Sequence, residues 1–180
     1  MQATPILREV RVDDLEALLG LEALCFESDR LSRRSFQRWI QRNNCILQIL
    51  EVKGHVRAYG LVLLHAGTRL ARLYSIALHP ETRGRGFASH LMLALEAAAA
   101  DQERLFMRLE VAKQNRAAIQ LYQRLGYHVF GELPNYYEDH SDALRMQKRI
   151  RYLDPAQEQI TLPWYGQATH STSTIPTRTR

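Results

Sequence analysis

Cysteine is scarce in this sequence, and several features that mark particular protein classes are missing from it. Its 180 residues include two cysteines, Cys25 and Cys45, which cannot form a disulfide framework and suit a reducing compartment such as the cytoplasm. No apolar run approaches the roughly 18 residues that a membrane-spanning helix requires. The first residues also lack the basic and apolar segments of a secretory signal. We therefore expect a cytoplasmic protein that does not enter a membrane.

Patterns for metal binding are also missing, and the charge is only mildly informative. The seven histidines show no HxH or HExxH spacing and the cysteines no CxxC spacing, so we expect no metal site. The net charge is +5, and all but three of the 24 basic residues are arginine, which favours bidentate contacts with phosphate or carboxylate. Charge alone does not decide between nucleic acid and a phosphorylated small molecule as the partner.

Length and hydrophobic patterning predict one domain and its element order. We place the domain at residues 1–153, and we expect the Ser-, Thr- and Gly-rich tail at 154–180 to have no core of its own. Asp13 is expected to open the first helix and Ser32 to cap the second, while Lys53-Gly54-His55 predicts a hairpin turn. Further helices are predicted at 87–101 and 115–125, and strands at 4–12, 45–53, 56–65, 70–78, 105–111, 127–131 and 143–150. The order βααβββαβαββ predicts an α/β fold with a mixed sheet flanked by helices.

The most informative segment is a glycine-rich turn between a strand and a long helix. The sequence Leu78-His79-Pro80-Glu81-Thr82-Arg83-Gly84-Arg85-Gly86-Phe87-Ala88-Ser89 ends a strand and starts the helix at about Gly86. Free backbone N–H groups at a helix N-terminus attract a phosphate, and glycine lets the backbone approach it closely. Taken alone, a pair of glycines here favours the other explanation, a tight connection between strand and helix that needs glycine for steric reasons. It matches neither GxxxxGK[ST] nor GxGxxG, so ATP and dinucleotides are poorly supported.

The context of this turn resembles a known family. Arg83-x-x-Gly86-x-Ala88 is similar to the (Q/R)xxGx(G/A) pyrophosphate loop of the GNAT superfamily of N-acetyltransferases. Leu109-Glu110-Val111, followed by Asn115-x-x-Ala118-Ile119-x-Leu121-Tyr122-x-x-Leu125-Gly126-Tyr127, resembles that superfamily's second signature. With Tyr136-Tyr137, these features resemble most the RimI-type ribosomal-protein-alanine acetyltransferases. The likeness is dense over residues 70–150.

The resemblance implies the acyl-CoA N-acyltransferase fold, with a twisted central mixed sheet, and acetyl-CoA as the cosubstrate. It places the pantetheine arm against the backbone of the strand end Ile76-Ala77-Leu78, as an added, non-protein strand. It also assigns Asn115 and Tyr122 to the cofactor. The diphosphate cradle implied by the resemblance consists of Arg83, Gly84, Arg85, Gly86, Phe87, Ala88 and Ser89.

Glu110 is the candidate general base. It shares one face of its strand with Phe106 and Arg108, and a carboxylate within an apolar strand needs a reason, because burial without a partner is costly. One reason is an ion pair with a neighbour in sequence, Arg108 or Lys113. The other is chemistry, since acetyl transfer needs a neutral amine. The residues alone do not separate the two, and the resemblance favours the base.

Tyr122 is the candidate general acid. It shares a helical stripe with Ala118, Leu121 and Leu125, a position that tyrosine usually occupies as part of a core. A phenol with a pKa near 10 can nevertheless protonate a leaving thiolate whose pKa is about 8.5. The resemblance implies that second role. Asn115 is expected to cap the same helix, and this role is compatible with a cofactor contact.

The acceptor is expected to be the α-amino group of a protein or peptide, because Tyr136 and Tyr137 resemble the tyrosines beside the peptide cleft of RimI-type enzymes. Two alternatives stay open: a small amine (a polyamine, amino acid or antibiotic), or a non-catalytic sensor of acyl-CoA. We expect direct transfer, a monomer or homodimer, and neither nucleic acid nor membrane as a direct partner.

Overall fold

A computed structural model of the chain describes residues 4–152. The predicted boundary at residue 153 and the tail at 154–180 lie outside the described residues, so that division stays a prediction. The predicted order of helices and strands is confirmed. The elements are β1 (Ile6–Glu9), the short 3-10 turn η1 (Val12–Asp14), α1 (Leu15–Cys25), α2 (Arg33–Ile40), β2 (Cys45–Val52), β3 (His55–Leu64), β4 (Leu70–Leu78), η2 (Pro80–Thr82), α3 (Phe87–Asp101), β5 (Phe106–Ala112), α4 (Arg116–Arg124), β6 (His128–Leu133) and β7 (Ala143–Arg149).

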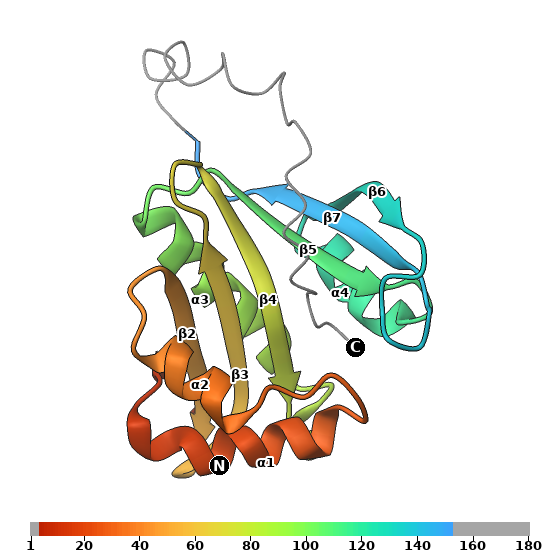
Figure 1. Cartoon of the computed structure of the whole chain (residues 1–180). Coiled ribbons are helices and arrows are strands. Elements are labelled where there is room, and N and C mark those ends of the chain that lie inside the picture. Colours follow the sequence, from red (N-terminus) through yellow and green to blue (C-terminus); the bar gives the residue numbers. More distant parts are fainter. Residues whose placement is uncertain (1–3, 153–180) are drawn as a thin grey trace.

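The described strands form one mixed sheet in the order β1-β2-β3-β4-β5-β7-β6 (Figure 1). Every neighbouring pair is antiparallel except β4 and β5, which are parallel. The predicted hairpin turn joins β2 to β3, and both Lys53 and Gly54 have positive φ angles, of 53° and 75°. A turn with two residues of positive φ has a backbone twist that matches the twist of the two strands it connects.

The helices divide the core between the two faces of the sheet. Leu91 and Leu95 of α3, with Tyr122 of α4, pack on one face. Leu18 of α1 and Phe36 of α2 pack on the other face, with residues of β2–β4. No helix within residues 4–152 is long and apolar enough to cross a bilayer.

A glycine in β3 makes close packing of α3 possible. A Cβ atom added to Gly60 would overlap the Cδ1 atom of Leu95, whose side chain is fully buried. We expect Gly60→Ala to lower the free energy of unfolding by about 1–3 kcal/mol, because the core must shift to admit one methyl group. Urea denaturation measures the change.

Gly20 provides the matched control for this substitution. It is exposed on α1, its φ is not positive, and an added Cβ would meet nothing within 4 Å. Gly20→Ala should raise the free energy of unfolding by about 0.5–1 kcal/mol, because alanine loses less backbone entropy in a helix. Equal stability of the two variants would contradict this account of the contact between β3 and α3.

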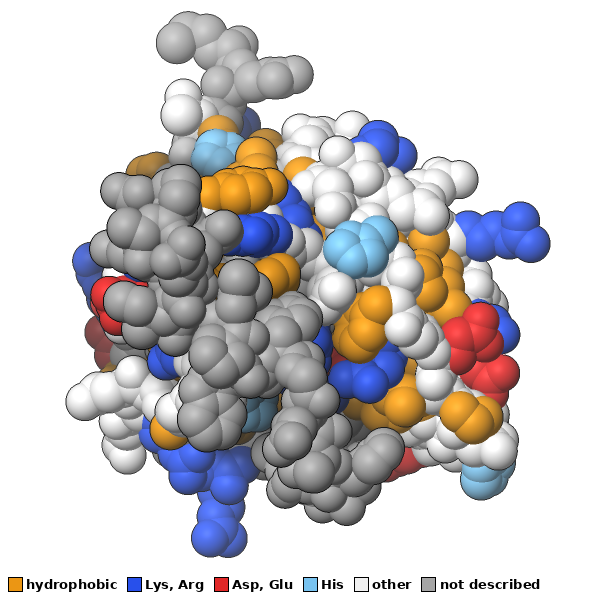
Figure 2. Space-filling model, turned by 90° about the horizontal axis from the view of Figure 1, so that it is seen from above, with side chains coloured by type: hydrophobic (Ala, Val, Ile, Leu, Met, Phe, Trp, Pro, Cys, Tyr) orange, Lys and Arg blue, Asp and Glu red, His pale blue; other side chains and the backbone are white. Residues whose placement is uncertain are grey.

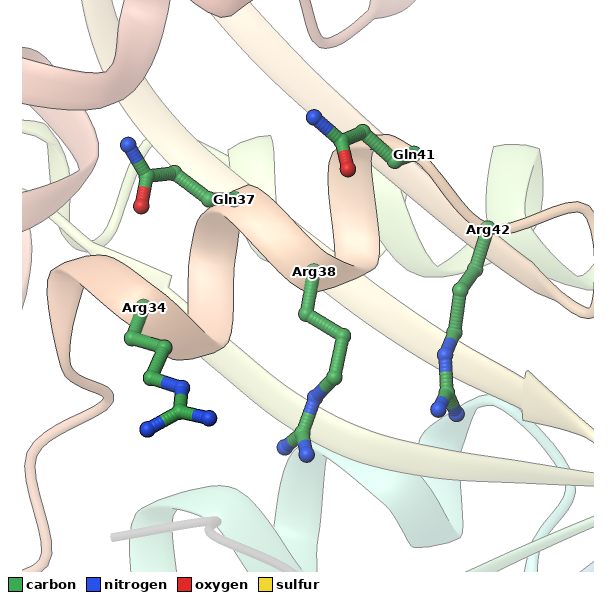
Figure 3. Close-up of a pocket in the computed structure, with 5 residues that line it drawn as sticks. All are labelled: Arg34, Gln37, Arg38, Gln41 and Arg42. Atoms are coloured by element: carbon green, nitrogen blue, oxygen red, sulfur yellow. The ribbon is translucent and has the colours of Figure 1, made fainter.

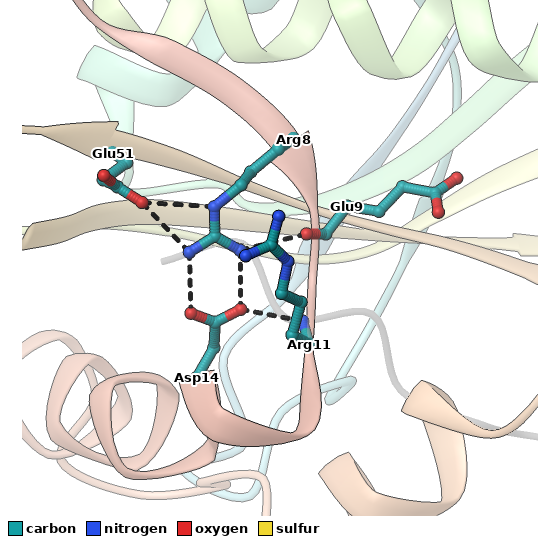
Figure 4. A network of polar contacts seen from close by, with 5 residues as sticks. All are labelled: Arg8, Glu9, Arg11, Asp14 and Glu51. Carbon is teal, nitrogen blue, oxygen red and sulfur yellow. Dashed lines mark hydrogen bonds and ion pairs between the residues drawn. The ribbon is translucent and has the colours of Figure 1, made fainter. Parts of the chain in front are cut away.

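The start of the first helix differs from the prediction in one residue. Asp14, and not Asp13, accepts a hydrogen bond from the backbone N–H of Arg11, at 2.7 Å, and α1 follows at Leu15. The Asp14 carboxylate also accepts a hydrogen bond from each terminal nitrogen of Arg8, both at 2.8 Å (Figure 4). The same guanidinium contacts Glu51 of β2 through Nε, at 3.1 Å. This network fixes α1 to the edge of the sheet.

This network should make part of the stability depend on pH. Arg8 holds the pKa of the Asp14 carboxyl below its ordinary 3.8, against the opposing effect of burial, and the N–H of Arg11 lowers it further. The stabilisation is therefore complete above pH 3.8 and is lost as the pH falls through the lower pKa of the folded state. Asp14→Asn should cost about 1–3 kcal/mol at pH 7. In urea denaturation the difference from wild type should vanish in strong acid; a difference that stays constant would show that the charge does not matter.

Candidate active site

The candidate site lies where β4 and β5 stop pairing. The two parallel strands pair only from Leu70 to Arg72 on β4 and from Phe106 to Arg108 on β5, although β4 continues to Leu78. Figure 1 shows the two strands diverging beyond this point. The predicted cofactor contacts on Ile76, Ala77 and Leu78 therefore lie on a stretch of β4 that, among residues 4–152, pairs with β3 alone.

A β-bulge on β4 determines which side chains face the candidate site. Leu61 of β3 pairs with Ser75 and Val62 pairs with Leu73, so that Tyr74 has no partner in the register. Leu73 packs with α3 and Tyr74 with the side chains of α1 and α2, as neighbours in a strand do, but beyond the bulge Ile76, three residues after Leu73, packs with α3 again. Bulges of this kind redirect side chains next to active sites.

The glycine-rich loop has the geometry of an anion site. Gly84 and Gly86 have φ angles of 74° and 78°, in the left-handed region that glycine adopts without strain. Gly86 is the N-cap of α3 and provides no side-chain cap, so the N–H groups of the first turn, beginning at Phe87, have no acceptor from the helix itself. Arg83 and Arg85 are exposed beside it. These residues fit a diphosphate.

Cys25 lies beside this loop and does not have the properties of a nucleophile. Its half-buried thiol donates a hydrogen bond to the carbonyl oxygen of Leu78, at 3.1 Å. Burial raises the pKa of the thiol, and the nearby Arg83 opposes this effect only in part. A thiol with a raised pKa is unreactive at neutral pH.

Glu110 is buried, with 4% of its surface exposed, and its partners are not those predicted. Arg72 of β4 donates to Glu110 Oε2 through Nε at 3.0 Å and through Nη2 at 2.9 Å. The Nε atom of Arg145 lies 3.8 Å from Oε1. The predicted alternatives are wrong, because Arg108 donates to Gln147 and Lys113 pairs with Glu132. Arg72 thus holds the Glu110 carboxylate by two hydrogen bonds to the same oxygen, Oε2.

Tyr136 joins the same cluster. Its hydroxyl oxygen accepts a hydrogen bond from Arg72 Nη2, at 2.9 Å. The Tyr136 ring meets the ring of Tyr137 edge to face, with centroids 5.1 Å apart, and Tyr137 is buried against Ala112 and Ala143. The structure therefore brings Glu110 and the first of the two predicted substrate tyrosines onto one guanidinium.

Tyr122 lies in α4, on the opposite face of the sheet from α1 and α2. Its side chain is 1% exposed and packs edge to face against Tyr127, with ring centroids 5.7 Å apart. Asn115 caps this helix as predicted, because its Oδ1 accepts a hydrogen bond from the N–H of Ala118 at 3.0 Å. The helix ends at Arg124, two residues before Gly126, whose φ is 94°.

Arg72 is the residue that the sequence analysis missed. It stands alone as a charge in the strand LARLYSIAL, and an arginine inside an apolar strand needs a buried acceptor as much as a carboxylate needs a donor. The single arginine in this apolar strand therefore indicates a buried acceptor for its side chain. Within residues 4–152, no three His, Cys, Asp or Glu side chains gather as a metal site.

Comparison with known proteins identifies the relatives of this chain. A model of the acetyltransferase (GNAT) family matches residues 12–127. An uncharacterised N-acetyltransferase of Methanocaldococcus jannaschii is 30% identical over 145 residues, covering 80% of this chain and 91% of that protein. A Bacillus subtilis protein named as a ribosomal protein bS18-alanine N-acetyltransferase is 25% identical over 147 residues, covering 81% and 96%.

A solved structure has the same fold. The ribosomal-protein-S18-alanine N-acetyltransferase from Escherichia coli superposes with a TM-score of 0.76 at 24% identity, covering 84% of this chain and 97% of that one. The fold predicted from the sequence, a mixed sheet flanked by helices, is confirmed.

Proposed function

The chain belongs to the GNAT family and is an acetyl-CoA-dependent N-acetyltransferase, and from this premise we propose that its acceptor is the α-amino group of a protein or peptide. The observation that carries the proposal is the cluster in which Arg72 holds Glu110 and Tyr136 together at the point where β4 and β5 diverge. It places a candidate base beside a tyrosine that resembles those of peptide clefts. The name of the Bacillus subtilis relative supports a ribosomal protein as one such acceptor.

Each proposed site residue has a chemical role. Acetyl-CoA supplies an acetyl group activated as a thioester. The N–H groups of the loop from Arg83 to Ser89 bind its diphosphate, and the free edge of Ile76-Ala77-Leu78 binds the pantetheine arm. Glu110 takes a proton from the amine, directly or through one water, and Tyr122 gives a proton to the departing sulfur. Asn115 fixes the start of the helix that holds Tyr122.

The chemistry of the acceptor favours an α-amine over a lysine side chain. An α-amino group has a pKa near 8 and lysine one near 10.4, so deprotonating lysine at neutral pH costs roughly 3 kcal/mol more. A carboxylate is a modest base. It therefore suits the α-amine, whose deprotonation requires less free energy.

Thiol release from acetyl-CoA against matched acceptors tests the proposal. The panel contains peptides with a free α-amine, the same peptides with that amine blocked and an internal lysine, and small polyamines. We expect turnover with the free α-amine to exceed turnover with the lysine peptide by at least about tenfold. Turnover with small amines alone would contradict the peptide assignment. Binding of acetyl-CoA without turnover on any amine would point to a sensor.

The loop can be tested separately from the acceptor. Gly86→Ala forces an L residue into the left-handed region, which costs roughly 1–2 kcal/mol, and it shifts the N–H groups that are proposed to hold the diphosphate. We expect the KM for acetyl-CoA to rise about tenfold. Gly67→Ala is the control, because Gly67 has a similar φ of 71° and equally open surroundings, but lies in the turn between β3 and β4. A rise in KM in both variants would remove the special role of Gly86.

A further inference from the structure

Three arginines form a row along one side of α2. Arg34 and Arg38 belong to α2 and Arg42 lies just past its end; all three side chains project to the same side, and with Gln37 and Gln41 they line an open hollow of about 550 Å³ (Figure 3). All three are exposed. We call these three residues the α2 arginine row.

The charge of the row is not balanced by the described part of the protein. No Asp or Glu occurs between Arg33 and Arg42, and none of the three arginines forms an ion pair with a residue in 4–152. The neighbouring Arg33 shows the contrast, because it pairs with Glu16 of α1 at 2.5 Å. Three adjacent guanidinium groups without carboxylates make an anionic partner favourable.

An aromatic residue orients the row and connects it with the candidate active site. The guanidinium groups of Arg38 and Arg42 lie over the ring of Trp39, at 5.4 and 5.2 Å from its centroid. Such stacking reduces the freedom that an arginine must lose on binding. The ring of Trp39 packs against that of Tyr74, 6.0 Å away, which is the bulged residue of β4. The row thus lies on the face of the sheet that α1 and α2 cover, and one aromatic ring separates it from the bulged stretch of β4.

The spacing of the row matches an extended polypeptide. Arg34 and Arg38 are four residues apart on α2, which separates them by about 6 Å along the helix axis. Alternate side chains of an extended chain lie about 6.7 Å apart on one face. Two carboxylates at alternate positions of a bound peptide can therefore meet Arg34 and Arg38, and Arg42 lines the same hollow and can meet a third. The geometry of a guanidinium suits bidentate contact with carboxylate.

We propose that the α2 arginine row binds an acidic, extended segment of the acceptor polypeptide, downstream of the α-amine that is acetylated. This inference rests on the proposed function, and it names the class of acceptor: proteins whose N-terminal region carries acidic residues at alternate positions. A nucleic acid fits less well, because a phosphate backbone calls for a continuous basic surface. Seen from above, the described surface carries several separate groups of Lys and Arg side chains among apolar and neutral ones (Figure 2).

The test compares two peptides and two variants. Both peptides have the same free N-terminus; one carries Glu at three alternating downstream positions and the other carries Gln there. The first variant is Arg34→Gln/Arg38→Gln/Arg42→Gln. The control variant is Arg11→Gln/Arg69→Gln/Arg124→Gln, which removes the same charge from exposed positions elsewhere. Initial rates give kcat and KM for each peptide, at low and at high salt.

For the wild type we expect a KM about tenfold lower for the Glu peptide than for the Gln peptide, with the difference shrinking as salt rises. The first variant should lose this preference while keeping kcat and the KM for acetyl-CoA, and the control variant should keep it. Equal KM values for both peptides with the wild-type protein would overturn the inference and leave the proposed function intact. Loss of preference in the control variant would also overturn it, because net charge would then explain the effect.

Two further outcomes lead to different conclusions. Absence of turnover on any free α-amine would overturn the proposed function, and the inference with it. The second outcome concerns nucleic acid, and fluorescence anisotropy with a labelled single-stranded RNA measures it. RNA binding that the first variant abolishes, with no change in its KM for the Glu peptide, would assign the row to nucleic acid instead.

Discussion

Replacing Glu110 by Gln should lower kcat by about 10²–10⁴ at pH 7, the range that a positioned general base contributes. The substitution preserves the shape of the side chain and an oxygen that Arg72 can contact, but removes the proton acceptor. The loss should depend on pH. Above the acceptor's own pKa, near 8, the amine is already neutral, so the deficit should narrow as the pH rises. Steady-state rates with a free α-amine peptide across this range measure it.

Two comparisons separate chemistry from structure in this variant. Glu132→Gln removes another carboxylate with a cationic partner, since Glu132 pairs with Lys113 at 2.6 Å in an exposed position, and it should leave kcat unchanged. A thermal melt of the Glu110→Gln protein reports whether losing the charge beside Arg72 affects folding. A rate deficit that is equal at every pH would make Glu110 a structural residue, as its ion pair with Arg72 alone would suggest.

Tyr122→Phe should lower kcat by about 10², with the KM for acetyl-CoA changed by no more than about twofold. The substitution removes one oxygen and keeps the ring that packs on Tyr127. Without the phenol, the thiolate must leave unprotonated or take its proton from water. Single-turnover measurements at saturating acetyl-CoA isolate the chemical step from product release.

Tyr127→Phe is the control for this pair of rings. Tyr127 is equally buried, and its pKa is raised well above 10.0 by burial and by the nearby carboxylate of Glu96. It should therefore remain a neutral core residue, and its hydroxyl should be dispensable for the rate. If both tyrosine variants lose the same activity, the effect belongs to the packing of α4 and Tyr122 is not the acid.

Local signals in the sequence were sufficient for most of the fold. Ser32 and Asn115 cap their helices as predicted, with bonds to backbone N–H groups three residues on. The turn at Lys53-Gly54 and the glycines of the loop were likewise readable, because each depends on a few adjacent residues. The choice between Asp13 and Asp14 failed, since it depends on the path of a 3-10 turn that both aspartates would tolerate.

The electrostatics of the site were not readable from the sequence. Arg72 and Glu110 are 38 residues apart, and they meet only because β4 and β5 pair in one particular register over three residues. Proximity in sequence favoured Arg108 and Lys113, whose side chains the sheet directs to other partners. The α2 arginine row depends on the fold in a similar way, because Arg34 and Arg38 lie on one side only once residues 33–40 form a helix.

The short pairing between β4 and β5 also has a consequence for how the protein unfolds. Within residues 4–152 the register of β4 and β5 spans three residue pairs, so backbone hydrogen bonds contribute little to holding the two parts of the sheet together. The core beneath α3 continues across the junction, with Leu73 on one side and Met107 and Met146 on the other. Cooperativity between the two parts therefore depends on side-chain packing. The described residues should melt in one transition, and weakening this core should split that transition in two.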